Sequence, residues 1–481
     1  MHASLSTRQR WEALAVLCLG VLMIVLDTTI VNVALPSIRT DLGFNETTLV
    51  WVVNAYMLTF GGFLLLGGRL GDLYGHRRMF LIGIVLFTVA SAACGLSYSQ
   101  VMLVVARAVQ GLGGAIVSAV ALSLMMNLFP EPAERARAMG VYSFVCAGGG
   151  SIGAIAGGLL TNLLNWHWIF LVNLPIGVAV YIACLKLVPS AQSRAASDRL
   201  DLGGALTVTV ALMLAVYAIV NGNEAGWQSV QTVGLLGSAA VFFAAFLITE
   251  ARVASPLVPL TMFRRRNLST ASAVGMLWSA AMFAWFFISA LYMQLILGYQ
   301  PLQVGLAFLP ANLIMAMFSL GLSARIVMRF GITRPLVVGL LIATAGLVLF
   351  TQAPQVPHEG DFVTHILPAM LLLGIGAGMG FNPLLLAAMN DVDPSDSGLA
   401  SGVVNTAFMM GGALGLAILA SIAGAETQHA LAAGIDEPSA LVDGYHLAFI
   451  VGAAFALVAA LLSAAVIRGQ VAQGAPAAHP Q

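Results

Sequence analysis

Residues 13–35 read ALAVLCLGVLMIVLDTTIVNVAL, an apolar run of 23 residues that contains one charged side chain, Asp27. A helix needs about 20 such residues to cross the hydrocarbon core of a bilayer. Arg8 and Arg10 precede the run as in a signal peptide, but the run is long enough to span and no small-residue cleavage site follows it. We therefore expect an uncleaved first transmembrane helix.

The whole chain shares this apolar character. Of its 481 residues, 60% are hydrophobic and 8% are charged, whereas a soluble domain carries about 25% charged residues. The 20 basic residues balance the 20 acidic ones without forming a basic patch, which excludes a nucleic-acid partner. The 50 glycines suit close helix packing in a membrane. Four single cysteines in apolar runs are interpreted as small core residues: Cys18, Cys94, Cys146 and Cys184.

A search with this apolar window predicts an all-α polytopic protein with fourteen transmembrane helices in the lipid bilayer. The candidate spans cover residues 13–35, 49–70, 79–97, 101–127, 138–163, 168–188, 202–221, 230–249, 270–294, 303–323, 335–352, 365–388, 399–424 and 446–467.

The distribution of basic residues predicts the orientation. With the N-terminus in the cytoplasm and fourteen crossings, 18 of the 20 Lys and Arg residues fall on the cytoplasmic side, as the positive-inside rule requires. The exceptions are Arg39, outside, and Arg107, within the fourth span. We expect a multi-pass protein of the cell inner (cytoplasmic) membrane with both termini in the cytoplasm. The 18 residues are Arg8, Arg10, Arg69, Arg77, Arg78, Arg135, Arg137, Lys186, Arg194, Arg199, Arg252, Arg264, Arg265, Arg266, Arg325, Arg329, Arg334 and Arg468.

A weak internal repeat suggests the domain organisation. The loop after the second span reads GGRLGDLYGHRRMFLIG from Gly67, and the loop after the tenth reads GLSARIVMRFGITRPLVVG from Gly321. If the two loops are equivalent, spans 1–6 match spans 9–14 and spans 7–8 are an insert, an arrangement typical of transporters. The predicted units are an N-terminal six-helix bundle (1–190), a two-helix insert with linkers (191–262) and a C-terminal six-helix bundle (263–481).

Asp27 and Arg107 are the ionisable residues that lie deepest in the predicted spans. Counted from the outer span ends, Asp27 lies about 12 Å and Arg107 about 9 Å deep at 1.5 Å per residue. An opposite charge at the same depth relieves the cost of a buried charge. Because burial raises the pKa of a carboxyl group and a nearby arginine lowers it, protonation can switch with conformation. Asp27 is therefore the candidate proton carrier, and a static ion pair that fixes helix packing is the alternative.

Other polar or aromatic residues within spans are candidate substrate contacts. Gln110 lies one turn from Arg107 and either orients it, contacts substrate or bonds to another helix. The ninth span is rich in aromatic residues, which line a cavity or face lipid. The candidates are Asn32, Asn54, Gln110, Trp278, Tyr292 and Asn405.

The fifth span contains Gly149, Gly153 and Gly157, each four residues apart. This spacing makes a flat helix face that another backbone can approach closely. The face serves tight packing, a moving contact between the two halves, or both.

The sequence lacks a P-loop, a dinucleotide-binding glycine fingerprint and an HExxH motif. We therefore expect no cofactor, no metal, no catalytic residues and no ATP hydrolysis, so that pumping depends on an ion gradient. A membrane-embedded enzyme is a remote alternative, since it requires a cluster of catalytic polar residues at one depth.

Several motifs in order along nearly the whole chain resemble the major facilitator superfamily, and within it the fourteen-span drug:proton antiporters. GRLGDLYGHRR, from Gly68 to Arg78, is similar to the signature loop between helices 2 and 3. LDTTIVNVALP from Leu26 and RAVQGLGG from Arg107 resemble the motifs of helices 1 and 4. WHWIFLVNLPIG from Trp166 resembles the junction of helices 5 and 6, and GLASGVVNTAFMMGGALG from Gly398 the thirteenth helix.

The resemblance implies a major facilitator fold, alternating access between two bundles and a proton site at Asp27 with Arg107. It also implies a gating loop with Gly68, Asp72 and Gly75, in which Asp72 joins Arg77 and Arg78 in a charge cluster that stabilises the outward-open state. The chain departs from the family pattern at Ala154, where proline is usual, at His167, where arginine is usual, and at Phe408 and Met409, where an Arg-Gln pair is frequent.

These features favour a proton-coupled exporter of small amphipathic organic compounds, such as drugs or secreted metabolites. Its expected partners are the small-molecule substrate, protons, the lipid bilayer and, as an open question, accessory proteins of the envelope. Uptake of an organic nutrient by proton symport is the alternative within transport.

Overall fold

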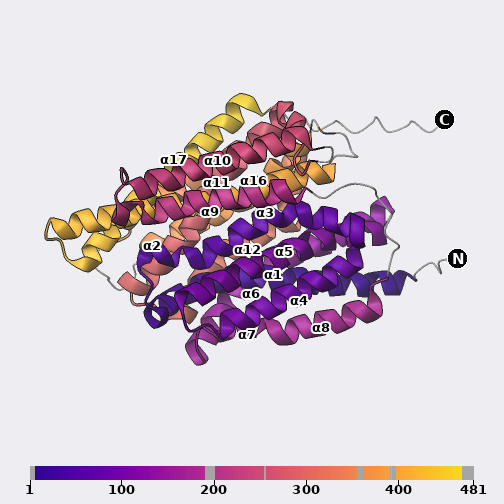
Figure 1. Ribbon diagram of the computed structural model, residues 1–481, viewed down its shortest axis with the longest axis horizontal. Helices are drawn as coiled ribbons and strands as arrows, with labels where there is room; N and C mark the ends of the chain where they lie inside the picture. The colour runs from indigo at the N-terminus through magenta and orange to yellow at the C-terminus, as the bar shows by residue number, and fades with distance from the viewer. Residues whose placement is uncertain are drawn as a thin grey trace.

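The computed structural model describes residues 6–129, 131–189, 201–253, 256–354, 362–390, 392 and 397–467, and these residues form helices without any strand (Figure 1). The first part contains α1 (Thr7–Leu42), α2 (Glu46–Leu49), α3 (Trp51–Tyr74), α4 (His76–Gly95), α5 (Gln100–Leu128), α6 (Pro132–Leu163), α7 (Trp168–Leu171) and α8 (Asn173–Leu187). A helical hairpin follows, made of α9 (Leu202–Ala225) and α10 (Val230–Arg252). The last part contains η1 (Leu260–Arg264), α11 (Arg266–Leu291), η2 (Tyr292–Ile296), α12 (Pro301–Met317), η3 (Phe318–Leu322), α13 (Ser323–Phe330), α14 (Thr333–Phe350), η4 (Phe362–Ile366), α15 (Leu367–Met389), α16 (Ser397–Ala432) and α17 (Glu437–Val466).

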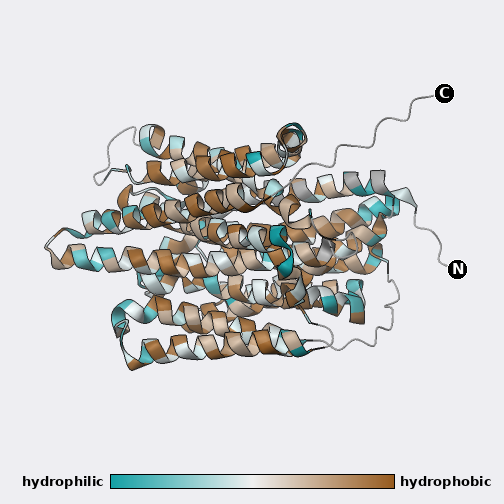
Figure 2. Cartoon of the chain, turned by 90° about the horizontal axis from the view of Figure 1, so that it is seen from above, coloured by the Kyte–Doolittle hydropathy of each residue, from teal (hydrophilic) through white to brown (hydrophobic). Residues whose placement is uncertain are grey.

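Among the described residues, 13 helices are long and apolar enough to cross a membrane, which confirms the predicted polytopic all-α class. Hydrophobic residues dominate the middle of the bundle and hydrophilic ones gather toward the helix ends (Figure 2). The remaining predicted span, 138–163, falls in α6, whose 32 residues correspond to a length of about 48 Å. Since several side chains of α6 are not described and α6 is not among those 13 helices, the count of fourteen stays a prediction.

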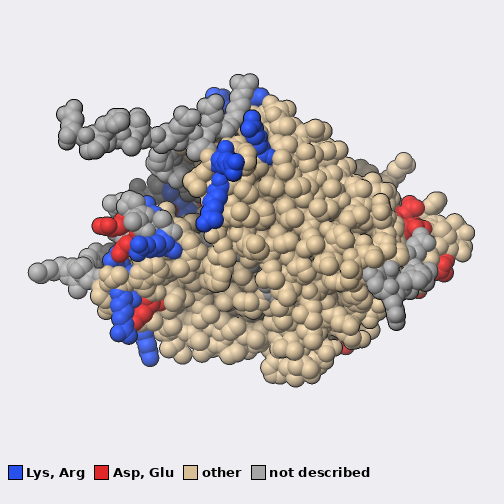
Figure 3. All heavy atoms as spheres, turned by 180° about the vertical axis from the view of Figure 1, so that it is seen from behind, with Lys and Arg blue, Asp and Glu red and all other residues tan. Residues whose placement is uncertain are grey.

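Most basic residues on the face shown in Figure 3 gather at one end of the bundle, where α1 begins and α17 ends, whereas Arg39 and Arg107 do not belong to this group. Arg8 begins α1, Arg78 begins α4, Arg252 ends α10 and Arg334 begins α14. Since successive spans run in opposite directions, these helix ends share one side. We call it the basic end. Arg194, Arg199 and Arg468 lie outside the described residues.

The α9–α10 hairpin lies on the outside of the bundle, where α9 contacts both α3 and α16. A Cβ on Gly62 of α3 would overlap with the hydroxyl of Thr209 in α9. Asn223, also in α9, donates a hydrogen bond to the carbonyl oxygen of Ser421 in α16 at 2.7 Å. One helix of the predicted insert therefore touches both parts of the chain that flank it. The unit boundaries at 190 and 262 stay predictions.

Two short loops at the basic end each contain a glycine with a positive φ, although ψ differs between them, 125° at Gly75 and −174° at Gly331. Gly75 precedes α4 with φ +91°, and Gly331 precedes α14 with φ +79°. Glycine adopts this left-handed region without the strain that a side chain causes. The shared positive φ fits the equivalence of the two loops that the sequence repeat predicts.

Candidate functional site

A cavity of about 720 Å³ extends from the middle of the bundle to the basic end. Its inner walls include Tyr56 and Phe60 of α3 and Met409 of α16, with Ser118 and Asn405 as polar side chains. Charged residues line it only near the mouth, where Arg69, Asp72 and Asp201 lie. A mainly apolar cavity with a few placed polar groups is typical of small-molecule sites.

On the side away from the basic end, the two halves of the chain are in contact. Asn54 of α3 donates a hydrogen bond to the carbonyl oxygen of Ala413 in α16 at 2.9 Å. Gln294 of η2 donates to the carbonyl oxygen of Val33 in α1, also at 2.9 Å. The described cavity therefore reaches the basic end, while these bonds join the halves on the opposite side.

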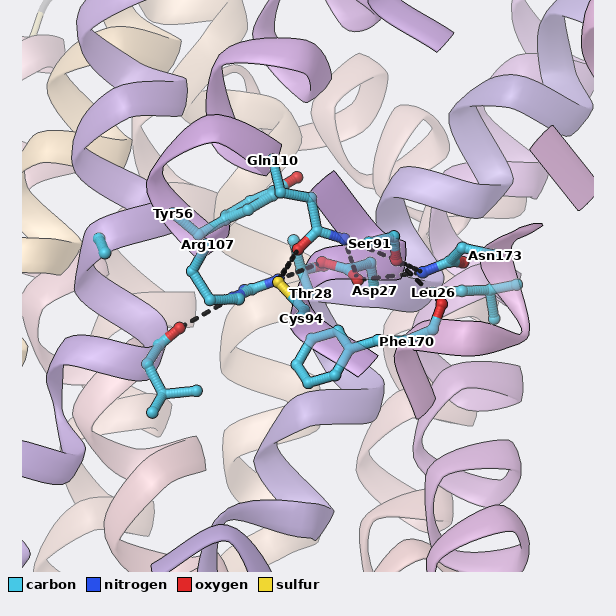
Figure 4. Close-up of polar contacts among 12 residues, drawn as sticks. Leu26, Asp27, Thr28, Tyr56, Ser91, Cys94, Arg107, Gln110, Phe170 and Asn173 are labelled. Carbon is cyan, nitrogen blue, oxygen red and sulfur yellow. Dashed lines mark hydrogen bonds and ion pairs between the residues drawn. The ribbon is translucent and has the colours of Figure 1, made fainter. Parts of the chain in front are cut away.

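Beside the inner end of the cavity, Asp27 and Arg107 form a buried ion pair (Figure 4). Arg107 Nη1 lies 2.5 Å from Asp27 Oδ2, and both side chains are almost fully shielded, with 2% and 0% of their surface exposed. The two helices α1 and α5 run in opposite directions, and a rise of 1.5 Å per residue brings both residues to the same depth. The predicted pairing is present in this conformation.

A polar network completes the surroundings of the carboxylate (Figure 4). Gln110 Nε2 donates to Asp27 Oδ1 at 2.7 Å, and Asn173 Nδ2 donates to the same oxygen at 3.1 Å. Ser91 Oγ accepts from both amides, at 3.1 Å from Gln110 and 2.9 Å from Asn173, and donates to the carbonyl oxygen of Phe170 at 2.9 Å. The three groups that contact the Asp27 carboxyl oxygens all donate hydrogen bonds, as they would to an ionised carboxylate.

Arg107 has further partners besides Asp27. Its Nε donates to the carbonyl oxygen of Val52 at 2.9 Å, and its Nη1 donates to Gln110 Oε1 at 2.7 Å. The guanidinium carbon lies 4.4 Å from the ring centre of Tyr56 and 5.6 Å from that of Phe170, within range for cation–π attraction. Because Tyr56 also lines the cavity, its ring separates the ion pair from the cavity.

The six predicted substrate contacts occupy different environments. Asn405 lines the cavity, and Gln110 belongs to the Asp27 network. Asn54 bonds across the halves, as described above, and the Asn32 amide bonds within α1 to the carbonyl oxygen of Thr28 at 3.3 Å. Their role as substrate contacts stays a prediction.

The aromatic side chains of the ninth span are mostly core residues. Trp278, Trp285 and Phe287 are buried, so they do not face lipid. Tyr292 is also buried and donates a hydrogen bond to the carbonyl oxygen of Pro354 at 2.7 Å. Neither Trp278 nor Tyr292 lines the cavity described above. A contact with substrate would therefore require another conformation.

The loop between α3 and α4 surrounds the cavity mouth. Gly68 and Asp72 line the cavity, and Asp72 Oδ1 lies 3.2 Å from His76 Nε2. Arg77 Nη2 donates to the carbonyl oxygen of Leu185 at the end of α8 at 2.6 Å, while Arg78 is exposed. Asp72 is thus paired with histidine here. The predicted cluster of Asp72 with Arg77 and Arg78 is not formed in this conformation, and its role in an outward-open state stays a prediction.

The predicted glycine face of α6 packs against α1. A Cβ on Gly149 would lie 2.8 Å from Val25, one on Gly157 would lie 2.7 Å from the carbonyl oxygen of Ile30, and one on Gly153 would overlap with Thr29. These contacts fit tight packing within the first half.

The contact between halves lies on an adjacent face of α6. A Cβ on Gly158 would lie 2.7 Å from the Cα of Leu302 in α12. Likewise, a Cβ on Gly305 of α12 would overlap with the carbonyl oxygen of Ala154. We call these four residues the α6–α12 seam. It contains Ala154, one of the departures from the family pattern.

The other departures also have defined surroundings. Met409 lines the cavity, and Phe408 packs against the rings of Phe283 and Phe381, with centroids 6.1 Å and 5.6 Å apart. His167 stacks on Trp166 at 3.8 Å between ring centroids. Three of the four cysteines are buried and free, as expected of core residues, and the side chain of Cys146 lies outside the described residues.

Ser91, Asn173 and Tyr56 are site residues that the sequence did not single out. Small polar residues and tyrosine carry no charge that marks them as costly in a membrane. Asn173 lies within WHWIFLVNLPIG, so that motif held a signal for it. Over the described residues, no group of three or more His, Cys, Asp or Glu side chains could hold a metal ion.

The structure combines apolar helices, a cavity that opens at the basic end of the bundle, and a charge pair buried beside the inner end of that cavity. This combination is typical of a polytopic membrane transport protein. The chain belongs to the Major Facilitator Superfamily, whose sequence model matches residues 17–416. It is therefore a transporter and not an enzyme.

Two curated relatives match over most of their length. The puromycin resistance protein pur8 of Streptomyces alboniger is 40% identical over 460 residues, covering 95% of this chain and 90% of its own. The cephamycin export protein CmcT of Amycolatopsis lactamdurans is 36% identical over 454 residues, covering 94% and 91%. The crystal structure of the POT family transporter PepTSo has the same fold, with a TM-score of 0.69 at 15% identity over 96% of this chain and 97% of its own.

Proposed function

We propose that this chain exports small amphipathic organic compounds in exchange for protons, by alternating access across the cell inner membrane. The relatives named above, a puromycin resistance protein and a cephamycin export protein, support export of organic compounds. The cavity supports the amphipathic class, because its inner walls are apolar with a few hydroxyl and amide groups and its charges lie at the mouth. The gathering of basic residues at the end with both termini supports a cytoplasmic location for that end (Figure 3).

Asp27 is the residue that carries the coupling proton in this proposal. Its carboxylate accepts hydrogen bonds from Arg107, Gln110 and Asn173, so this cavity-open state corresponds to an ionised Asp27. A proton-coupled exporter requires an open cavity together with an ionised Asp27 at the stage when it has released its proton to the cytoplasm and has not yet bound substrate. The buried position of the pair beside the cavity is the observation that carries the proposal.

The contacts of Arg107 explain how the pair can titrate. When a proton neutralises Asp27, Arg107 keeps the Val52 carbonyl oxygen, the Gln110 amide oxygen and the Tyr56 ring as partners. These groups stabilise a buried guanidinium after its carboxylate is lost.

The cycle then follows from the exposure of Asp27. Substrate enters the cavity from the cytoplasm while Asp27 is ionised, and the halves rock to open the opposite side. A proton from outside neutralises Asp27, the Arg107 bond loosens, and the substrate leaves. The return to the present conformation delivers the proton to the cytoplasm.

Flux in inside-out membrane vesicles tests this function. With an acidic lumen, which corresponds to the cell exterior, we expect a fluorescent amphipathic compound to accumulate in the lumen and a proton ionophore to abolish the accumulation. A panel of compounds of differing charge defines the substrate class. Proton symport for nutrient uptake predicts the opposite direction, since an acidic lumen would then drive the compound out.

A further inference from the structure

Two buried carboxyl groups lie together where the α9–α10 hairpin meets the basic end. Asp201 is the N-cap of α9, and its Oδ1 accepts from the backbone N–H of Gly204 at 2.7 Å. Glu250 lies two residues before the end of α10, and its Oε2 accepts from the backbone N–H of Val258 at 3.1 Å. Asp201 is 4% exposed and Glu250 is 3% exposed. Neither residue takes part in the Asp27 network.

The second oxygen of each carboxyl group has no hydrogen-bond partner. Asp201 Oδ2 and Glu250 Oε1 are both buried and unpartnered among the described residues. Each lies 2.7 Å from the point where a Cβ on Gly204 would stand. The two oxygens are therefore at most about 5.4 Å apart, on either side of the glycine. A buried acceptor without a hydrogen-bond partner costs free energy, so a donor between these two oxygens would stabilise the pair.

The surroundings supply little compensating charge. The linker that bonds to Glu250 contributes Pro256, Leu257 and Val258, and Leu257 packs with Leu66 of α3 and Ala205 of α9 in an apolar cluster. On α3, Arg69 and Asp72 line the same cavity as Asp201. On α10, Arg252 is exposed. Arg69, Asp72 and Arg252 are the other charged residues that the described helices α3 and α10 contribute near Asp201 and Glu250.

The geometry selects the kind of cation that the pair can hold. Calcium takes six to eight oxygen ligands and magnesium about six, whereas two unpartnered oxygens converge here. Because Glu250 is 3% exposed and its Oε1 is buried, an organic ammonium group in the cavity does not reach both unpartnered oxygens. A proton needs no such shell, and one proton on a pair of adjacent carboxyl groups removes the repulsion between two buried negative charges.

We propose that Asp201 and Glu250 form a second proton-binding site that holds one shared proton near neutral pH and exchanges it with the cytoplasmic side of the cavity. Asp201 lines the cavity and provides the route to water. The site is separate from Asp27 in position and in the helices that build it. The proposal therefore stands whether or not Asp27 carries the coupling proton.

Infrared spectroscopy of the full chain in lipid nanodiscs tests the proposal, with Asp27→Asn as the background so that Asp27 cannot contribute. Near neutral pH we expect an absorbance band of a protonated carboxyl group that corresponds to one proton per chain. The band should disappear when either Glu250→Gln or Asp201→Asn is added, because each replaces a carboxyl group by an amide that donates to the other. It should disappear at alkaline pH without either substitution.

Glu224→Gln is the matched control, since Glu224 is an exposed glutamate of the same hairpin that accepts a hydrogen bond from Asn45 at 3.0 Å. We expect this variant to keep the band. A band that persists in both the Glu250→Gln and Asp201→Asn variants would overturn the proposal. Its absence from the Asp27→Asn background alone would do so too, without any hairpin variant having to fold.

Discussion

At the scale of single residues, the ion pair owes its tolerance in the membrane to the hydrogen bonds that both partners make with surrounding groups. Asp27 accepts from three donors, and Arg107 donates to Val52, Gln110 and Asp27 itself. Removal of Arg107 leaves Asp27 as a buried charge without a cation, whereas removal of the Asp27 charge leaves Arg107 with its other partners.

Arg107→Ala should lower the free energy of unfolding by about 3–5 kcal/mol, because Asp27 then stays buried without its cation. Addition of Asp27→Asn to that variant should restore part of the loss, since it removes the unpaired charge. Thermal unfolding of the detergent-purified variants measures both effects. Arg8→Ala, at an arginine whose side chain is 89% exposed, should change stability little. A double variant no more stable than Arg107→Ala would argue against a charge-based role for the pair.

Sequence reasoning could find this pair but not its network. Helical rise converts residue number into depth, so two opposite charges at one depth indicate a pair. Ser91 on α4 and Asn173 on α8 join them only through tertiary packing, which spacing within one helix does not reveal. Polar residues of this size also occur as ordinary interhelical contacts, so their type alone did not mark them.

At the scale of elements, one helix presents glycines to two different neighbours. Gly149, Gly153 and Gly157 of α6 fit α1, whereas Gly158 and Ala154 meet α12 across the α6–α12 seam. The sequence predicted a close-packing face correctly, but assigning faces to partners required the angular position of each neighbour. Gly158 lies next to Gly157 in sequence and contacts a helix more than 140 residues away.

Gly305→Ala should shift the equilibrium away from the present conformation, because its Cβ would overlap with the α6 backbone at Ala154 in this state. Thiol labelling of Ser123→Cys, on the cavity wall, measures the shift, and we expect it to fall several-fold. Gly140→Ala is the matched control, since no atom lies within 4 Å of a Cβ at that position of α6. Gly153→Ala should instead reduce folded yield. Unchanged labelling of folded Gly305→Ala protein would mean that the α6–α12 seam does not control access to the cavity.

Asp72→Asn should slow turnover and leave the protein predominantly in the present conformation. Here Asp72 pairs with His76, and neutralisation removes the charge that the outward-open cluster with Arg77 and Arg78 would need. Turnover and Ser123→Cys labelling, measured together, check this expectation. Glu12→Gln, which removes an acid paired with Arg8 on the same side, serves as control. If turnover is normal at normal expression, the loop has only an orienting role.

At the scale of the whole molecule, hydropathy was sufficient to predict the class, whereas the orientation that the charge distribution indicates stays a prediction. Each predicted span coincides with a helix or with consecutive helical segments and extends beyond them by at most two residues, because hydrocarbon admits little else. The helix ends were less predictable: α1, α16 and α17 continue beyond the apolar windows, since a helix does not stop where the hydrocarbon does. The contacts of α9 with α3 and α16 could not be predicted from the sequence. The position of the two-helix insert between the repeated units does not determine the surface on which the insert packs.

Cysteine labelling of intact cells tests the orientation. Phe263→Cys lies at the basic end and Ile435→Cys in the turn between α16 and α17 at the other, both on exposed side chains. A membrane-impermeant thiol reagent should label Ile435→Cys and spare Phe263→Cys until the membrane is opened. The buried Cys18, Cys94 and Cys184 should give low background. Labelling of Phe263→Cys from outside would reverse the orientation.

The central claim, that Asp27 carries the coupling proton, is tested most directly by accumulation of substrate against an imposed pH gradient in vesicles that contain Asp27→Asn. Asparagine keeps the size of aspartate and removes its titration. We predict that accumulation is abolished while the protein folds and downhill exchange of substrate persists. Asp41→Asn, at the exposed outer end of the same helix where Asp41 accepts from Trp166 at 2.9 Å, should accumulate substrate like the wild type. Accumulation by Asp27→Asn at the wild-type level would contradict the claim and move the coupling proton to another site.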